Sequence, residues 1–471
     1  MKVEQLYTGC LAEAAYYIES GGEAVIIDPL RETKPYLELA KKYNSRIKYI
    51  LETHFHADFV SGHLDLAKKT GGTIVYGPTA QPSFEAHIAK DGEELKLGNV
   101  VIKVLHTPGH TMESSTFLLK DENGKDYALF TGDTLFIGDV GRPDLATKND
   151  LTREDLAGLL FESIQQQIMP LADDVFIYPG HGAGSACGKN MSHERVSTLG
   201  EQKKFNYALR PGITKAEFIK EVTEGLVEPP SYFPKDAVLN KTGYLCIDDI
   251  IAKGTKGLSL NEFLAVWEST NALVLDTRNK NEFAKAFIPG SIFIGVEDQF
   301  APWAGSLITD LKQPLLIICD NHKEEEVVVR LARVGHDNTL GFLTGGIHTW
   351  IEAGNDIDSI KEIAAEDFAV LYAKDAENMH LLDARKESEY NSHHIIGAEN
   401  FPLDFINRNM SMLNKNKTYY IHCAGGYRSL IACSILKARG FDNVINIKGG
   451  FKILATTALN KTSYVAPRTM L

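Results

Sequence analysis

The sequence predicts a multidomain α/β protein, with a layered N-terminal region followed by two tandem domains that share one parallel α/β fold. Three observations lead to this prediction. The chain has 471 residues, too many for one ordinary domain. Up to about residue 230, short β-type runs alternate with loops and helical segments. Beyond that point the sequence repeats itself once.

Composition and charge restrict the class of partner. With 44% hydrophobic and 24% charged residues, the chain has globular composition. Its net charge of −13 argues against binding to a nucleic-acid backbone. No run approaches the about 20 apolar residues that a membrane-spanning helix needs. Residues 1–7 lack the basic and then apolar pattern of a signal peptide, so we expect a cytoplasmic protein without a membrane partner.

In the first region, the β-type runs are residues 24–27, 47–51, 100–105, 127–130 and 175–178. Each ends at a polar or Gly/Pro cluster, which is typical of a strand followed by a loop. Paired prolines at 229–230 interrupt regular structure, and we place the first domain at residues 1–235.

The second half contains the repeat. Asp276-Thr277-Arg278 recurs as Asp383-Ala384-Arg385, 107 residues later, and Cys319 recurs as Cys423, 104 residues later. Copies of about 100 residues are too long for a solenoid repeat and therefore predict two domains, which we place at residues 256–357 and 362–471. Alternating strand and helix patterns predict a parallel sheet in each.

Histidine and aspartate gather at predicted strand ends in the first region. The segment His54-Phe55-His56-Ala57-Asp58 follows the run 47–51, and alternate residues at a strand exit point to one side. Three further clusters contain His110, Asp133 and His181. One such histidine would more often be a hydrogen-bonded core residue. Four clusters in this arrangement instead predict a first-row metal site.

The motifs THxHxD, HTPGHT, TGD and PGH, in this order, resemble the metallo-β-lactamase superfamily. The longer strings at 52–62 and 138–145 resemble its persulfide dioxygenase branch, especially bacterial fusions with rhodanese domains. The resemblance covers nearly the whole chain and implies an αββα sandwich for the N-terminal domain. Hydrolytic two-metal members such as glyoxalase II carry a histidine after the aspartate, where this chain has Phe59. That departure favours a mononuclear site.

The resemblance to persulfide dioxygenases implies one Fe(II) per N-terminal domain, held by His54, His110 and Asp133. Two histidines and one carboxylate leave positions open for substrate and O₂. The residues that would orient ligands and waters, or bind zinc in an alternative form, are His56, Asp58 and His181.

The implied reaction is oxidation of a low-molecular-weight thiol persulfide by O₂ to sulfite and free thiol. Because zinc cannot activate O₂, the alternative is a zinc-dependent thiolester hydrolase of glyoxalase II type. A non-catalytic sulfur-sensing or docking protein is a further alternative, which the intact ligand set opposes. The thiol carrier stays open between glutathione, coenzyme A and bacillithiol, and the family suggests a homo-oligomer.

Two more residues are candidates for substrate binding. Arg142 either anchors substrate or holds the active-site loop, or it forms a structural ion pair with Asp139 or Asp144. Cys187 lies in the glycine-rich loop at 182–189 and is a candidate for receiving sulfane sulfur. A lone loop cysteine, however, is more often inert.

Cys423 follows a predicted strand at 419–422 and precedes Gly425, Gly426, Arg428 and a helical run. Loop N–H groups and the helix N-terminus would face the sulfur and stabilise a persulfide anion. Within the repeat framework this string resembles rhodanese. The resemblance implies that Cys423 is the sulfur-carrying nucleophile, that Arg428 binds the oxyanion of the substrate, and that thiosulfate and sulfite are partners. Gly425 and Gly426 are candidates for substrate binding.

The first copy has lost these features. Cys319 is followed by a loop without glycine and by three consecutive glutamates at 324–326, whose carboxylates repel an anion. We therefore expect a degenerate, inactive module. The fusion implies that persulfide oxidation is coupled to sulfane-sulfur transfer, which would detoxify sulfide.

Overall fold

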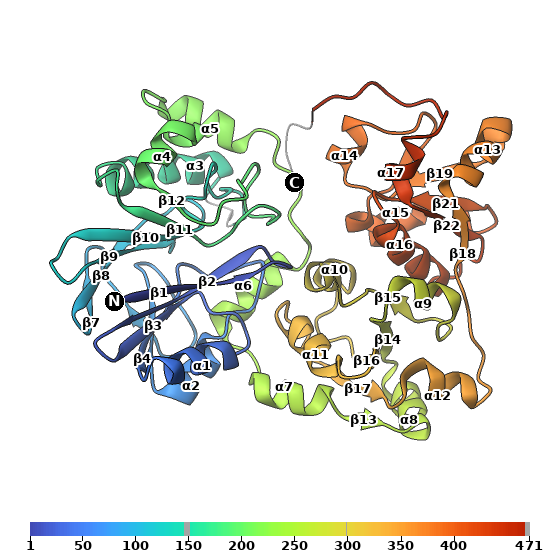
Figure 1. Ribbon diagram of the computed structural model, residues 1–471, viewed down its shortest axis with the longest axis horizontal. Helices are drawn as coiled ribbons and strands as arrows, with labels where there is room; N and C mark the ends of the chain where they lie inside the picture. The colour runs from blue at the N-terminus through green and yellow to red at the C-terminus, as the bar shows by residue number, and fades with distance from the viewer. Residues whose placement is uncertain (146–150, 298, 467–471) are drawn as a thin grey trace. The chain divides into compact units, whose positions relative to one another are not determined.

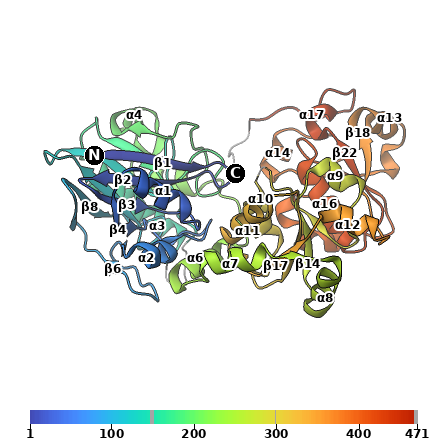
Figure 2. The ribbon, with the colours of Figure 1, turned by 60° about the horizontal axis from the view of Figure 1, so that its bottom comes forward.

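A computed structural model describes residues 1–145, 151–297 and 299–466. Residue 471, the predicted end of the last domain, lies outside the described residues. The chain divides into two compact units, one formed mainly by Met1–Ile247 and the other by Asp248–Leu331 and the residues from His336 onward (Figures 1 and 2). Among the described residues, no helix has the length and apolarity that a membrane crossing requires.

The first unit contains two six-stranded mixed sheets, each following chain order. The strands of the first sheet are β1 (Lys2–Thr8), β2 (Glu13–Ser20), β3 (Glu23–Ile27), β4 (Arg46–Leu51), β5 (Thr73–Tyr76) and β6 (His87–Ile88). Those of the second are β7 (Glu94–Leu97), β8 (Val100–His106), β9 (Ser115–Lys120), β10 (Asp126–Gly132), β11 (Phe176–Pro179) and β12 (Ser197–Thr198). Strands β3 to β6 are parallel, as are β10 and β11.

Helices cover the outer face of each sheet, so the unit has four layers (Figure 1). The first sheet is covered by α1 (Lys34–Lys42) and α2 (His63–Thr70), and the second by α3 (Arg153–Ser163), α4 (Leu199–Phe205) and α5 (Lys215–Thr223). A further helix, α6 (Phe233–Thr242), follows the paired prolines.

Strand β2 shows how the sequence produces these layers. Its side chains alternate between two apolar clusters, because successive residues of a strand face opposite sides. Ala14, Tyr16 and Ile18 belong to the core between the sheets, whereas Ala15 and Tyr17 pack with the helices. The predicted αββα sandwich is confirmed.

The second unit contains two five-stranded parallel sheets with the same topology, in the orders β13-β17-β16-β14-β15 and β18-β22-β21-β19-β20. Their strands are β13 (Gly257–Leu258), β14 (Leu273–Asp276), β15 (Ile292–Phe293), β16 (Leu315–Ile318), β17 (Thr339–Leu343), β18 (Lys361–Ala364), β19 (His380–Asp383), β20 (Glu399–Asn400), β21 (Tyr419–His422) and β22 (Val444–Lys448). The shared strand order confirms that the sequence repeat encodes two copies of one parallel α/β fold.

Helices connect the strands of both copies. Those of the middle module are α8 (Leu260–Thr270), α9 (Lys280–Lys285), α10 (Phe300–Leu307), α11 (Glu324–Ala332) and α12 (Gly346–Glu352), preceded by α7 (Ile247–Gly254). Those of the C-terminal module are α13 (Ala365–Asp375), α14 (Glu387–Ser392), α15 (Ile406–Asn409), α16 (Tyr427–Ala438) and α17 (Gly450–Leu454). In both modules a cysteine follows directly on a central strand, β16 or β21.

Phe130 offers a test of the core between the two sheets of the first unit. Its ring is 1% exposed and stacks on Tyr178, with ring centroids 5.2 Å apart. We expect Phe130→Ala to lower the free energy of unfolding of the first unit by about 3–5 kcal/mol, because it leaves a cavity. Phe205, which is 76% exposed, is the matched control, and Phe205→Ala should have little effect.

All three tryptophans lie in the second unit, at positions 267, 303 and 350. Urea unfolding followed by circular dichroism should therefore show an earlier transition in Phe130→Ala, while tryptophan fluorescence should report an unchanged transition. Equal shifts in both signals would contradict independent cores.

Candidate metal centre and sulfur-transfer loop

Four buried polar residues meet where strands of both sheets end. His54 follows β4 of the first sheet, whereas His110, Asp133 and His181 follow β8, β10 and β11 of the second. An isolated β-bridge between Glu13 and His181 joins the two sheets beside them. Each of these five side chains is almost inaccessible to solvent. The structure thus brings together the four predicted strand-end clusters.

Asp133 lies at the centre of the group. Its Oδ2 is 3.4 Å from Nε2 of His110 and 4.0 Å from Nε2 of His54, and its Oδ1 is 3.5 Å from Nε2 of His181. The ligand atoms of His54, His110 and Asp133 lie within 4.8 Å of one another. Three imidazoles therefore present the same ring nitrogen to one carboxylate.

Backbone carbonyls fix two of these imidazoles. Nδ1 of His110 donates to the carbonyl oxygen of Arg142 at 2.9 Å, and Nδ1 of His181 to that of Ala12 at 3.2 Å. Because a carbonyl oxygen can only accept, Nδ1 carries the proton in both rings and Nε2 presents a lone pair toward Asp133.

A side-chain relay orients His54. The hydroxyl of Thr53 donates to Oδ2 of Asp28 at 2.8 Å and so can accept from Nδ1 of His54, 3.0 Å away. Gly132 packs against this threonine with φ of +48°, and a Cβ there would lie 2.5 Å from the Thr53 hydroxyl. Burial and the neighbouring His56 lower the pKa of His54 well below its usual value, so its ring is neutral and able to bind a metal.

The group fits a cation. Within the described part of the chain, both carboxylate oxygens of Asp133 and Nε2 of His181 are buried without a hydrogen-bond partner. Leaving such atoms unpaired is costly, and a bound metal ion would compensate each of them. Two imidazoles and a carboxylate suit a first-row ion with open coordination positions.

His56 is held by a different set of acids. Its Nε2 lies 3.1 Å from Oδ1 of Asp28 and 3.4 Å from Oε2 of Glu52, and its ring packs on Phe59 with centroids 4.4 Å apart. Burial alone would lower the pKa of His56, but the two carboxylates raise it well above its usual value. His56, Asp28 and Glu52 thus form a buried group of their own, whose ligand atoms lie within 4.8 Å of one another.

Asp58, His181 and Cys187 form another buried group whose ligand atoms lie within 4.8 Å of one another. Nε2 of His181 is 3.3 Å from Oδ2 of Asp58. Burial, followed by the charges of Asp58 and Asp133, raises the pKa of the Cys187 thiol well above its usual value. Cys187 therefore lies beside the candidate metal centre in its protonated form.

Arg142 joins three segments of the chain near this centre. Its guanidinium makes two 2.7 Å contacts with Asp144 and donates to the carbonyl oxygens of Ala186, at 3.2 Å, and Val227, at 2.5 Å. Its backbone N–H donates to the carbonyl oxygen of Cys187 at 3.0 Å. These contacts are the ones expected if Arg142 holds the active-site loop and forms an ion pair with Asp144.

Three further buried acids lie near the site and were not predicted from the sequence: Glu13, Asp28 and Glu52. Asp28 follows the strand β3 as the predicted ligands follow theirs, and Glu52 lies two residues before His54, so both had a detectable signal. Glu13 is the first residue of β2, and no pattern in the sequence indicated that it lies near the site. Burial raises the pKa of Glu13 well above its usual value.

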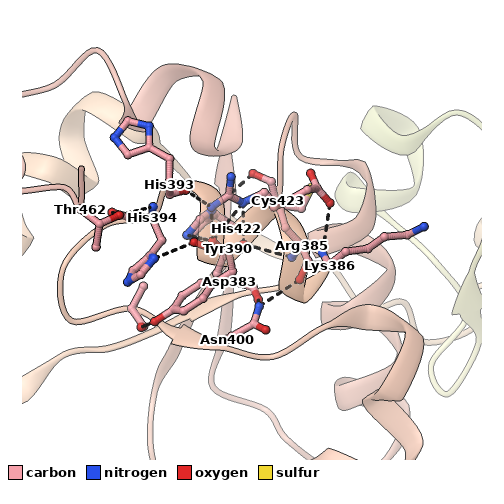
Figure 3. A network of polar contacts seen from close by, with 12 residues as sticks. Asp383, Arg385, Lys386, Tyr390, His393, His394, Asn400, His422, Cys423 and Thr462 are labelled. Carbon is pink, nitrogen blue, oxygen red and sulfur yellow. Dashed lines mark hydrogen bonds and ion pairs between the residues drawn. The ribbon is translucent and has the colours of Figure 1, made fainter. Parts of the chain in front are cut away.

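In the C-terminal module, Cys423 follows β21 and precedes α16 (Figure 3). Its Sγ accepts the N–H of Gly426 at 3.1 Å and lies 3.5 Å from the hydroxyl of Ser429. Gly426 has φ of +96°, which disfavours other residues, whereas a Cβ on Gly425 would meet open space. The predicted loop thus directs an N–H group and a helix N-terminus at the sulfur.

Arg428 is paired with a carboxylate. Its two terminal nitrogens contact Glu389 at 2.5 and 2.9 Å. Burial alone would raise the pKa of Glu389, but Arg428 lowers it below its usual value. Arg428, which we expect to bind the oxyanion of the substrate, is therefore paired with the carboxylate of Glu389.

A buried network supports the strand before Cys423 (Figure 3). Asp383 accepts from the backbone N–H of Arg385 at 3.0 Å and from its Nε at 2.9 Å, and Nε2 of His422 lies 3.7 Å away. The guanidinium of Arg385 also donates to the carbonyl oxygen of His393 at 2.8 Å. These bonds join the end of β19 to the residue that follows α14, beside the end of β21.

The middle module has the same buried Asp–Arg network but lacks the glycine-containing loop after its cysteine. Arg278 makes the same contacts with Asp276, and donates at 2.8 Å to the carbonyl oxygen of Ala286. Burial, followed by Glu324 and Asp320, raises the pKa of Cys319 to about 12. This thiol stays protonated at neutral pH.

Comparison with known proteins gives matches in every domain. The family described as "Metallo-beta-lactamase superfamily" matches residues 8–181, and "Rhodanese-like domain" matches residues 259–353 and 369–455. A probable hydroxyacylglutathione hydrolase of Schizosaccharomyces pombe is 30% identical over 48% of this chain and 91% of its own length. The mitochondrial persulfide dioxygenase of Homo sapiens is 32% identical over 42% of this chain and 70% of its own length.

A solved structure is similar over a longer range. The crystal structure of a metallo-beta-lactamase from Staphylococcus aureus has a TM-score of 0.63 and 32% identity, and the match covers 73% of this chain and 98% of that chain. Sequence relatives thus divide between hydrolase and dioxygenase names at about equal identity.

Asp133→Asn should remove the metal, because the neutral amide no longer compensates the cation at the centre of the group. We expect metal content after reconstitution to fall at least about tenfold, since even residues that only orient ligands change metal affinity by that much. His87→Ala is the matched control, since His87 lies on β6 and contacts Glu93 at 2.6 Å. Elemental analysis showing equal metal in Asp133→Asn and wild-type protein would contradict the assignment.

Proposed function

This chain belongs to the metallo-beta-lactamase superfamily and carries two rhodanese-like domains, and from this premise we propose that it is an iron-dependent persulfide dioxygenase coupled to a sulfurtransferase. The substrate of the first domain is a low-molecular-weight thiol persulfide. The C-terminal module moves sulfane sulfur between persulfide and thiosulfate through Cys423.

The observation that carries the dioxygenase proposal is the separation of His56 from the ligand set. Phe59 stands where the two-metal hydrolases have an imidazole, and its ring covers His56, which pairs with Asp28 and Glu52. A second metal position therefore lacks the imidazole that Phe59 replaces, and His56 is paired with carboxylates instead. The remaining set of two histidines and one carboxylate is the facial triad of Fe(II) oxygenases.

Iron bound by His54, His110 and Asp133 would bring persulfide and O₂ together, and the protein residues prepare that centre. Carbonyls and Thr53 hold the Nδ1 protons, so the Nε2 lone pairs stay directed at the metal position. In the balanced reaction, persulfide anion, O₂ and water give free thiol, sulfite and a proton. The outer sulfur is oxidised, O₂ is reduced, and water supplies the third oxygen of sulfite.

At the C-terminal module, the thiolate of Cys423 attacks the outer sulfur of thiosulfate. The sulfur–sulfur bond breaks, sulfite leaves with the electron pair, and a Cys423 persulfide anion remains. The Gly426 N–H and the N-terminus of α16 stabilise that anion. Run in reverse, the step consumes the sulfite that the first domain makes.

The second candidate function is a zinc-dependent thiolester hydrolase. The group of Asp58, His181 and Cys187 favours it, because this group could hold a second metal ion next to Asp133. The similarity to a probable hydroxyacylglutathione hydrolase points the same way.

Metal content and O₂ consumption distinguish the two functions. Anaerobically purified protein should hold about one iron per chain and consume O₂ when glutathione persulfide or coenzyme A persulfide is added. Two zinc ions per chain, no O₂ uptake and hydrolysis of S-lactoylglutathione would instead establish the hydrolase.

Two cysteine variants test the sulfurtransferase. Cys423→Ser should abolish sulfur transfer from thiosulfate to cyanide, because it removes the nucleophile. Cys319→Ser is the matched control and should retain full activity, since burial and then the nearby carboxylates raise the pKa of the Cys319 thiol. Activity lost in Cys319→Ser and kept in Cys423→Ser would reverse the assignment.

A further inference from the structure

We propose that the middle module, which lacks a catalytic loop of its own, positions the catalytic loop of the C-terminal module by holding helix α16. The inference rests on the proposed sulfurtransferase function of Cys423. The residues that carry it are Tyr427, Ser434 and Lys437, which contact the middle module or the segment joined to it along the whole helix.

Helix α16 is buried on more than one side. Its residues from Ser429 to Leu436 form an unbroken run of eight buried positions. A helix that covers only its own sheet buries a stripe and exposes the opposite face. A continuous buried run therefore requires a second contact surface, which the middle module supplies within the same unit.

The first contact is made at the beginning of the helix. Tyr427 directly follows Gly426, whose N–H points at Sγ of Cys423. The Tyr427 hydroxyl donates to the carbonyl oxygen of Gly295 at 3.0 Å, and its ring meets Phe293 edge to face with centroids 5.9 Å apart. Both partners belong to the middle module, so its backbone fixes the residue next to the sulfur cradle.

The second contact lies two turns further along the same face of α16. The hydroxyl of Ser434 accepts the backbone N–H of Phe293 at 2.9 Å. Phe293 ends β15, the edge strand of the middle sheet, where this N–H has no neighbouring strand to pair with. A buried N–H needs an acceptor, and α16 provides it.

The third contact lies near the end of the helix. The ammonium group of Lys437 contacts Asp358 at 2.6 Å and the carbonyl oxygen of Ser359 at 3.1 Å. Asp358 is itself bonded to the middle module, because its backbone exchanges two 2.9 Å hydrogen bonds with Phe287. Contacts at residues 427, 434 and 437 therefore fix both the position and the rotation of α16.

The position of α16 matters for sulfur transfer because the N–H of Gly426, at the start of this helix, donates to the reacting sulfur. Misplacement of a catalytic group by about 1 Å can cost about 100-fold in rate. A module that holds this helix thus contributes to catalysis without touching substrate. It can do so although its own loop carries three glutamates instead of a glycine-rich cradle.

Tyr427→Phe tests the proposal, because it removes the hydroxyl and keeps the ring. We expect kcat for sulfur transfer from thiosulfate to cyanide to fall about threefold to tenfold, as for the loss of one neutral hydrogen bond felt in the transition state. KM should change less. Alkylation of Cys423 by iodoacetamide, followed by peptide mass spectrometry, should slow by a similar factor.

Tyr419→Phe is the matched control. The Tyr419 hydroxyl accepts the backbone N–H of Asn414 at 2.8 Å inside the C-terminal module, so its loss should leave kcat and alkylation within about twofold of wild type. Tryptophan fluorescence reports whether each variant is folded at the assay temperature. Should Tyr427→Phe fail to fold, Ser434→Ala applies the same test two turns away.

Unchanged kcat and unchanged alkylation in folded Tyr427→Phe or Ser434→Ala would overturn the proposal, even if either variant melts at a lower temperature. Failure of the sulfurtransferase assignment gives a different result. In that case wild-type protein shows no sulfur transfer, and the alkylation rate of Cys423 alone decides whether the middle module sets the loop.

Discussion

The N-terminal unit is organised around the buried carboxylate of Asp133, which lies where strands of both sheets end. Among the described residues this carboxylate has no hydrogen-bond donor, yet three imidazoles direct Nε2 toward it. Burying a charge in this way is unfavourable unless an opposite charge is bound. The fixed Nδ1 protons, the glycine beside Thr53 and the bridge between the sheets all prepare this point for a cation.

The acids around the centre divide its histidines between different carboxylates. Asp28 and Glu52 pair with His56, whose ring packs on Phe59. On the other side, Asp58, His181 and Cys187 retain a donor set. The donors therefore fall into separate groups, each defined by the carboxylate that its imidazole meets.

The grouping of His54, His110 and Asp133 was predictable from the sequence. Each follows a predicted strand, and the carboxyl ends of neighbouring strands meet at one edge. The orientation of His56 was not predictable, since it depends on Asp28, which lies in another strand connection. Likewise, the repeat identified Cys423 and the degenerate Cys319, but gave no sign that Glu389 would pair with Arg428. Contacts between distant side chains require the packed structure.

The two rhodanese-like modules have the same strand order, but the C-terminal module depends on contacts with the middle module. Helix α16 has apolar or hydrogen-bonded contacts on both its own sheet and the edge strand β15 of the preceding copy. The order of the modules along the chain therefore has a direction. Exchanging their positions would separate α16, the helix that follows Cys423, from this edge strand and would expose the face that the strand now covers. The two copies are therefore not interchangeable in the chain, because the second copy has a preceding copy whose edge strand its helix covers.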